Sequence, residues 1–241
     1  MNLVLDFGNS RIKAGLFNGT SLEEMHVFTS VTDLAHALDT FNGIARCIVA
    51  SVTQQHQQVI ESCQSRFNIV LFSHNTPIPL KNLYKSVLTL GSDRLAAAVG
   101  AFTRYPGRPV LTIDAGTCLK YNFVTAGGEY LGGAISPGIP MRLKAMHHYT
   151  HSLPLLKINN SYDKLTGTTT EESLLSGAMM GAACEADEMI SRYFHLYPAL
   201  VVVVTGGDGE FLCRQLKNRF FAHQNILLEG LNTILNYQFE K

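Results

Sequence analysis

One short motif occurs twice in this chain, and its spacing limits the possible folds more than any other feature. Residues 3–17 read LVLDFGNSRIKAGLF, and residues 111–124 read LTIDAGTCLKYNFV. In both stretches an apolar run ends at an aspartate, a glycine follows two residues later, and a second apolar run comes after it. Asp6 and Asp114 are separated by almost half of the 241 residues. Two strand–turn–strand units at this spacing predict a duplicated α/β fold.

The segments around the two motifs predict two similar lobes, 1–105 and 106–241, whose hairpins face each other across a cleft. In the first lobe the expected strands are 3–5, 12–17, 24–28, 45–51 and 69–72, and the expected helices are 32–41, 54–66 and 92–105. In the second lobe the expected strands are 110–113, 119–124, 130–131 and 200–205, and the expected helices are 171–193, 211–220 and 226–237.

The composition argues against several classes of partner. Lys plus Arg and Asp plus Glu number 19 each, so the chain has no electrostatic footprint for nucleic acid or for an anionic membrane. The longest apolar run, 199–204, is far too short to cross a bilayer, and the N-terminus does not read as a secretory signal. Five scattered cysteines without a CxxC pair argue against a disulfide framework or a structural zinc site. We expect a cytoplasmic protein that binds neither nucleic acid nor membrane.

The residue types at both turns suit the binding of phosphate. Glycine lets the backbone approach an anion closely and expose its N–H groups. Further donors and positive charges follow at Asn9, Ser10, Arg11, Lys13 and Thr117. Asp6 and Asp114 would repel a polyphosphate unless a cation lies between carboxylate and phosphate, and Mg²⁺ commonly bridges the two. The repeated motif therefore predicts a nucleotide with its metal, although a single motif of this kind is usually only a turn.

Five motifs along the chain together resemble one family. They are YKSVLTLGSDR at 84–94, DAGT at 114–117, LGGAISPG at 131–138, GTTTEESLLSG at 167–177 and TGGD at 205–208. In this order and spacing they resemble the type III pantothenate kinases of the acetate kinase/sugar kinase/Hsp70/actin superfamily, over essentially the whole chain. The resemblance implies a duplicated ribonuclease-H-like (actin-like ATPase) fold with two lobes around a nucleotide cleft. It also implies phosphorylation of pantothenate by ATP, the first committed step towards coenzyme A.

The resemblance assigns the nucleotide site to both hairpins. The ATP phosphate loop would comprise Asp6, Phe7, Gly8, Asn9, Ser10, Arg11, Ile12 and Lys13. Asp6 would organise Mg²⁺ through water, and Thr117 would contact an ATP phosphate. Asp114 would help to bind the monovalent cation, K⁺ (or NH₄⁺), that such enzymes need.

The resemblance also implies the substrate site. Pantothenate would be lined by Tyr84, Gly91, Ser92, Asp93 and Arg94, with Asp93 as the catalytic base. Thr170 would reach the pantothenate of the neighbouring subunit, since the family forms homodimers with active sites at the interface.

Two segments depart from the family pattern. Thr169 stands where the family typically has Asn, so either Thr169 or Thr170 could contact the substrate. The second hairpin of the family commonly reads DAGTAxTxD, whereas this chain has Cys118, Lys120 and Asn122 at the Ala, Thr and second Asp positions. Lys120 could reach a phosphate or could face solvent.

Structural alternatives accompany several of these assignments. Asp93 or Ser92 could simply cap the helix that follows, Arg94 could form a surface ion pair, and Tyr84 could be a packing aromatic. The stretch HHYTH at 147–151 fits a polar surface or dimer contact better than a metal site, and the T-x-x-E spacing within 168–172 fits a capping box. The alternative functions are another small-molecule kinase of the same fold and a non-catalytic transcriptional accessory factor.

Overall fold

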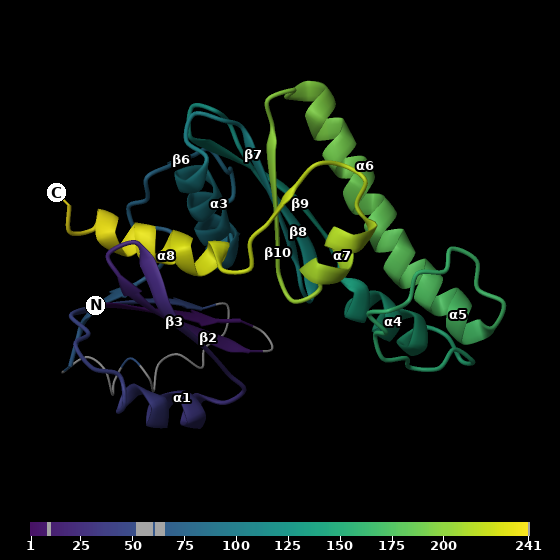
Figure 1. The fold of residues 1–241 in the computed structure, drawn as a ribbon, viewed down its shortest axis with the longest axis horizontal. Helices are drawn as coiled ribbons and strands as arrows, with labels where there is room; N and C mark the ends of the chain where they lie inside the picture. Colours follow the sequence, from purple (N-terminus) through teal and green to yellow (C-terminus); the bar gives the residue numbers. More distant parts are fainter. Residues whose placement is uncertain (9–10, 52–59, 61–65, 241) are drawn as a thin grey trace. The chain divides into compact units, whose positions relative to one another are not determined.

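The computed structural model describes residues 1–8, 11–51, 60 and 66–240, and the chain divides into two compact units (Figure 1). The first unit comprises Met1–Gly107, Gly128–Leu131 and Asn225–Lys241. The second comprises Arg108–Gly127 and Gly132–Gln224.

The first unit is built on a five-stranded sheet with the strand order β3-β2-β1-β4-β5. The strands of this sheet are β1 (Asn2–Phe7), β2 (Ile12–Asn18), β3 (Ser21–Phe28), β4 (Arg46–Ser51) and β5 (Asn68–Leu71). The unit also contains the short strand β6 (Lys81–Asn82), which is not part of this sheet. Its helices are α1 (Val31–Leu38), a 3₁₀ turn (Val87–Thr89), α3 (Ser92–Arg104) and α8 (Ile226–Tyr237). β6 pairs with Glu129 and Tyr130, the first two residues of the long strand β9.

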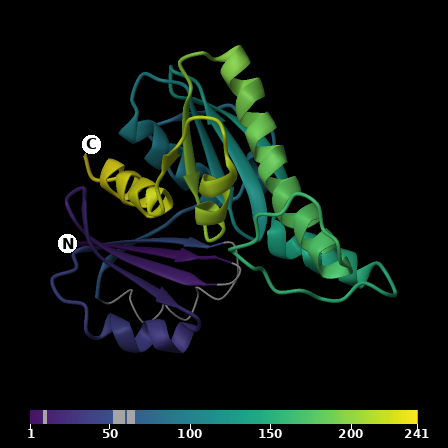
Figure 2. The ribbon, with the colours of Figure 1, turned by 45° about the vertical axis from the view of Figure 1, so that its right-hand side comes forward.

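The two faces of this sheet are covered by different helices, with α1 on one face and α8 on the other (Figures 1 and 2). Alternate residues of β1 point to the same face, so Leu3, Leu5 and Phe7 pack with Leu34 and Leu38 of α1 in one buried cluster. The antiparallel pairing of β1 with β2 and its parallel pairing with β4 place β1 at the centre. The end of β1, which carries Asp6, is therefore held from both sides.

Helices α3 and α8 of the first unit touch through glycines. A Cβ placed on Gly100 would lie 2.1 Å from the carbonyl oxygen of Ile226, and one placed on Gly230 would lie 1.9 Å from the carbonyl oxygen of Ala96. Both distances are far below van der Waals contact, and both contacts involve backbone atoms that cannot rotate away. The two helices can pack this closely only because neither position carries a side chain.

The second unit is built on strands in the order β11-β10-β7-β8-β9. Its strands are β7 (Val110–Ala115), β8 (Cys118–Val124), β9 (Glu129–Pro137, entered from the first unit), β10 (Val201–Thr205) and β11 (Phe221–Ala222). Its helices are α4 (Ile139–His148), α5 (Thr170–Leu175), a π-helical turn (Ser176–Met180), α6 (Gly181–Leu196) and α7 (Gly209–Gln215).

The sheet of the second unit repeats the sheet of the first. The order β9-β8-β7-β10-β11 corresponds strand by strand to β3-β2-β1-β4-β5. The sense of pairing also repeats, since β7 is antiparallel to β8 and parallel to β10, as β1 is to β2 and β4. In both units the next strand, β5 or β11, is parallel to its neighbour. The duplication predicted from the two Asp-x-Gly motifs is therefore present in the topology.

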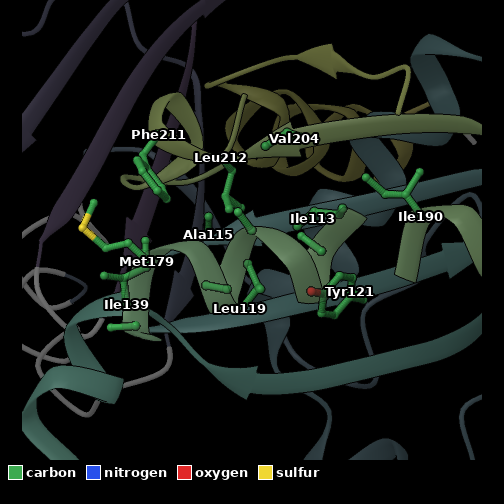
Figure 3. Close-up of a cluster of buried hydrophobic side chains, with 14 of the residues drawn as sticks. Ile113, Ala115, Leu119, Tyr121, Ile139, Met179, Ile190, Val204, Phe211 and Leu212 are labelled. Carbon is green, nitrogen blue, oxygen red and sulfur yellow. The ribbon is translucent and has the colours of Figure 1, made fainter. Parts of the chain in front are cut away.

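One large hydrophobic cluster stabilises the second unit (Figure 3). Ile113 and Tyr121, from the hairpin strands, pack with Met179 and Ile190 of the long helical segment. Phe211 of α7 completes the cluster. Burial of apolar area on this scale is the main contribution to the stability of such a unit.

Most of the expected elements are present. In the second half, the helix expected at 171–193 is divided into α5, the π-helical turn and α6, strand β11 was not expected, and three further elements differ. The strand expected at 130–131 extends to Pro137, because Gly133 lies against the backbone of Tyr121, where its Cβ would be 2.0 Å from the carbonyl oxygen. The helix α4, which has only Ile139 and Leu143 as buried residues, was not expected from its weak apolar pattern. The helix expected at 211–220 ends at Gln215.

The early end of α7 has a specific cause. Oδ1 of Asp187 accepts hydrogen bonds from the backbone N–H groups of Lys217 (2.9 Å) and Asn218 (3.0 Å). These amides therefore bond to α6 instead of continuing the helix. The helix expected at 54–66 lies outside the described residues except for 60 and 66. Within the described ranges, no helix has both the length and the apolar composition that crossing a membrane would require.

Candidate active site

The first hairpin places a carboxylate directly opposite a lysine. Asp6 of β1 pairs in register with Lys13 of β2, and Asp6 is only 8% exposed. The turn begins at Gly8, whose N–H donates to the carbonyl oxygen of Arg11 at 3.1 Å. Asn9 and Ser10, both expected in the phosphate loop, lie outside the described residues. The described part of the loop thus has one buried acid and two cations, Arg11 and Lys13.

Two expected members of the phosphate loop cannot offer their side chains. Phe7 and Ile12 are 0% and 4% exposed and belong to the hydrophobic cluster under α1. Arg11 is exposed and Lys13 is half-buried. Phe7 and Ile12 can therefore contribute only backbone groups to a ligand.

The second hairpin repeats the arrangement. Asp114 of β7 lies opposite Lys120 of β8, and Nζ of Lys120 lies 2.6 Å from Oδ2 of Asp114. The two side chains are only 20% (Lys120) and 17% (Asp114) exposed. The turn closes through a hydrogen bond from Gly116 N–H to the carbonyl oxygen of Cys118 (3.1 Å), and Thr117 at its tip is exposed. Lys120 faces a carboxylate here, not open solvent.

Two glycines from distant loops pack against this turn. Gly138 donates its N–H to the carbonyl oxygen of Thr117 at 3.1 Å, and its Cβ would lie 2.0 Å from the carbonyl oxygen of Gly116. Gly206 has φ +96°, and its Cβ would lie 2.3 Å from the carbonyl oxygen of Ala115. The motif LGGAISPG, which ends at Gly138, and the motif TGGD, which contains Gly206, thus both support the second hairpin. The sequence showed Gly138 only as part of a motif, without this physical role.

The neighbouring Gly207 is different, because a Cβ placed there would meet nothing within 4 Å. Of the two adjacent glycines in the TGGD motif, Gly207 alone has open space in place of a side chain. Asp208 lines a small cavity with mostly apolar neighbours, and burial raises its pKa. With a volume of about 10 Å³ the cavity has room for little more than one water molecule. A polyphosphate would not fit in this cavity.

The residues expected at the catalytic base lie at the start of α3. Gly91 is the N-cap residue, and Oδ1 of Asp93 accepts the N–H of Arg94 at 2.9 Å. A Cβ placed on Gly91 would lie 2.4 Å from this same oxygen, so glycine makes room for the carboxylate. Oγ of Ser92 is buried and has no hydrogen-bond partner among the described residues. Neither Ser92 nor Asp93 is the N-cap residue, although Asp93 does bind a first-turn amide.

Arg94 is buried, not part of a surface ion pair. It is 5% exposed, and its guanidinium carbon lies 5.6 Å from the ring centroid of Tyr84. The Tyr84 ring is in turn 6.2 Å from the ring of Tyr130, and its backbone N–H is held by Asn82. Tyr84 therefore packs as an aromatic residue and also orients the arginine.

The two neighbouring threonines, Thr169 and Thr170, differ in their contacts. Oγ1 of Thr169 accepts the N–H of Glu172 at 3.2 Å, so Thr169 is the N-cap of α5 and the capping-box spacing is confirmed. Glu172 in turn accepts hydrogen bonds from Lys164 and from Thr168, and these lower its pKa to about 2. Thr170 is exposed and has no hydrogen-bond partner within the described part of the chain.

An ionic cluster that the sequence reasoning missed ties α6 to the sheet of the second unit. Glu185 of α6 accepts hydrogen bonds from Tyr121 of β8 and Ser136 of β9, and it pairs with Arg142 of α4. Burial, reinforced by Glu185, raises the pKa of Tyr121. The only sequence signal that could have indicated this cluster is Glu185, which stands among small residues at the start of α6.

One imidazole of the histidine-rich stretch contacts the backbone. Nδ1 of His147 lies 2.7 Å from the carbonyl oxygen of Leu153. Among the residues described, no group of three or more His, Cys, Asp or Glu side chains could hold a metal ion.

Comparison with known proteins gives one family. The family model described as type III pantothenate kinase matches residues 2–192. A type III pantothenate kinase of Flavobacterium johnsoniae is 37% identical over 243 residues, which cover 100% of this chain and 99% of the relative. A type III pantothenate kinase of Christiangramia forsetii is 39% identical over 240 residues and covers 98% of both chains.

Solved structures with this fold include a Baf family transcriptional activator of Campylobacter jejuni, with a TM-score of 0.67 and 19% identity over 99% of this chain and 100% of the other. A ROK family glucokinase of Streptomyces griseus in complex with glucose and AMPPNP has a TM-score of 0.53 and 11% identity over 98% of both chains. Such identities indicate a shared fold alone. They confirm the expected duplicated ribonuclease-H-like architecture.

Proposed function

The chain belongs to the type III pantothenate kinase family, and we propose that it transfers the γ-phosphoryl group of ATP to the 4′-hydroxyl of pantothenate. This is the first step towards coenzyme A. The observation that carries the proposal is the family match over residues 2–192, because that range includes both Asp-x-Gly hairpins and the Gly91–Arg94 turn. The expected compartment is the cytoplasm, where ATP is available.

ATP and a divalent metal fit the residues of the first hairpin. A single buried carboxylate, Asp6, suits Mg²⁺, which keeps several waters and takes its other ligands from phosphate oxygens. Mg²⁺ neutralises phosphate charge when it is bound. Arg11 and Lys13 would pair with phosphate oxygens, as would the exposed Thr117 hydroxyl of the second hairpin.

Pantothenate fits the residues around the start of α3. Its carboxylate requires a cation, and the guanidinium of Arg94 is oriented by stacking near Tyr84. The unpaired hydroxyl of Ser92 offers a further polar contact. Because Gly91 has no side chain, it leaves the Asp93 carboxylate open to a substrate at this position.

The chemistry requires one proton acceptor. A primary alcohol is a weak nucleophile, and a carboxylate within hydrogen-bond reach can orient the hydroxyl and accept its proton as the new P–O bond forms. Asp93 would take this role, because the Arg94 amide holds one of its oxygens in place. Phosphoryl transfer otherwise depends on positioning and charge neutralisation.

K⁺ at Asp114 fits less well than Mg²⁺ at Asp6. The Asp114 carboxylate already has the ammonium group of Lys120 at 2.6 Å. Lys120 would therefore compete with the expected K⁺ (or NH₄⁺) for the Asp114 carboxylate.

The expected homodimer gives Thr170 a testable role. Thr170→Ala should raise KM for pantothenate by about tenfold, the usual effect of losing one polar substrate contact, with little change in the unfolding midpoint. Thr169→Ala should instead lose the helix cap, destabilising the α5 segment by about 1 kcal/mol, with a smaller effect on KM. Steady-state kinetics and thermal unfolding of both variants separate these roles. If Thr169→Ala gave the larger KM effect at unchanged stability, the assignment would be reversed.

A coupled ADP-release assay tests the proposed function. The full chain with Mg²⁺ and ATP is expected to release ADP with pantothenate and not with hexoses or acetate. Phosphorylation of a hexose without phosphorylation of pantothenate would instead identify another small-molecule kinase. Absence of turnover with every substrate would favour a non-catalytic protein.

A further inference from the structure

We propose that the ammonium group of Lys120 is the resident monovalent cation of the second hairpin, so that the enzyme works without added K⁺ or NH₄⁺. The proposal deepens the kinase function argued above and rests on it. Its starting point is the contact between Nζ of Lys120 and Oδ2 of Asp114.

The hairpin itself imposes the pairing of these two residues. Asp114 and Lys120 are direct cross-strand neighbours, one residue pair before the turn, so their side chains leave the same face of the sheet. Both are about four-fifths shielded from solvent, at 17% and 20% exposure, and such a pair is screened less than a surface pair. An ammonium group is thus held where a bound cation would otherwise contact the carboxylate.

The described neighbours of Asp114 on this face, Thr112, Asn122 and Thr205, add no further negative charge. After the turn, the hairpin carries a positive charge at Lys120 and a neutral side chain at Asn122. Asn122 is fully buried and donates its amide to Oγ1 of Thr112 at 3.1 Å. The paired residue of β10, Thr205, is also neutral and donates to the carbonyl oxygen of Gln224. Among the described residues of this face, Asp114 is the acid at the end of the hairpin, and Lys120 neutralises it.

The register of this pair repeats in both hairpins, and the assignment rests on the Lys120–Asp114 contact of the second. In the first hairpin the last acid before the turn, Asp6, lies opposite Lys13, and in the second Asp114 lies opposite Lys120. Each half of the fold therefore places a lysine at the equivalent register position. An ion such as K⁺ needs several oxygen ligands, whereas a lysine ammonium needs only acceptors for its three N–H groups and is already tethered. Lys120 is a positioning residue here, acting through the orientation and charge of Asp114.

The test is the cation dependence of the full chain. Rates of pantothenate phosphorylation are measured at about 100 mM KCl, NH₄Cl or choline chloride, at equal ionic strength and with sodium- and potassium-free ATP. The wild-type rate is expected to change by less than about twofold when choline replaces K⁺. Lys120→Ala is expected to lose on the order of tenfold in choline and to recover in K⁺ or NH₄⁺. The double variant Lys120→Thr/Asn122→Asp, which restores the family pattern, is expected to depend on K⁺ in the same way.

A second measurement does not require turnover. K⁺ is expected to raise the unfolding midpoint of Lys120→Ala and of the double variant relative to choline, and to leave that of the wild type unchanged. Lys120→Arg, which keeps the charge, should remain independent of K⁺. Arg192→Ala removes an exposed ion pair with Glu188 on α6 and serves as the matched control, with no change in cation dependence.

The outcomes separate the two proposals. A wild-type rate that falls at least about tenfold in choline would overturn the role of Lys120, as would a Lys120→Ala variant that stays active without K⁺. If the wild type phosphorylated no pantothenate in any salt, the kinase function would fail, while the unfolding measurements would still decide whether the second hairpin takes up K⁺.

Discussion

Replacing Asp93 with Asn should lower kcat for pantothenate phosphorylation by about a thousandfold, equivalent to about 4 kcal/mol of transition-state stabilisation. The amide keeps the size of the side chain and can still accept the N–H of Arg94, as Oδ1 of Asp93 does at 2.9 Å. It cannot accept the proton of the pantothenate hydroxyl. Binding of ATP should persist, because the expected phosphate loop lies at Asp6–Lys13, on another element.

The measurement pairs steady-state kinetics with titration of a non-hydrolysable ATP analogue. Unchanged analogue affinity and an unchanged unfolding midpoint would show that the loss is chemical. If Asp93→Asn kept more than about a tenth of the wild-type kcat, Asp93 would not be the base. Its bond to the first turn of α3 would then be its main role.

The second large effect concerns stability. Gly230→Ala should destabilise the protein by about 3 kcal/mol, lowering the unfolding midpoint by roughly 6–12 °C. The added Cβ would lie 1.9 Å from the carbonyl oxygen of Ala96 and 2.8 Å from the backbone nitrogen of Gly100. Because these are backbone atoms inside α3, relief requires the two helices to separate, and their buried apolar residues would lose contact.

Gly177→Ala is the matched control. It is also a helical glycine, but its Cβ would meet nothing within 4 Å. Since alanine favours a helix over glycine by about 1 kcal/mol, this change should be neutral or slightly stabilising. Calorimetric unfolding of both variants distinguishes crowding from helix propensity. Equal midpoints for the two variants would contradict the close contact between α3 and α8.

Much of the fold could be predicted because its signals are local. The apolar alternation of Leu3, Leu5 and Phe7, followed by a glycine turn, specifies a hairpin strand whatever the rest of the chain does. The Ala-rich segment of α3 is helical for the same reason. Strand β9 and the end of α7 were predicted less well, because both depend on partners far away in sequence, Tyr121 and Asp187 respectively.

The candidate site likewise divides into residues found from local sequence signals and residues whose contacts depend on the tertiary structure. Asp6, Asp93 and Asp114 were identified from motif and spacing, and Thr169 was distinguished from Thr170 only through its bond to Glu172. The alternative of a surface ion pair for Arg94 was wrong, because the side chain is buried. An arginine at the start of a helix gives no local sign that an aromatic ring 10 residues upstream lies close to it.

By itself, the sequence determined a duplicated α/β fold, because turn residues and apolar periodicity act over a few neighbouring residues and recur in both halves; the kinase family followed from the resemblance of its five motifs. Only the tertiary structure decided that Lys120 neutralises Asp114, that Gly138 and Gly206 support the second turn, and that Gly100 and Gly230 let two helices touch. These contacts depend on strand register and on the close approach of segments that are often far apart in sequence. The residues themselves carry no local sign of the partner that they will meet.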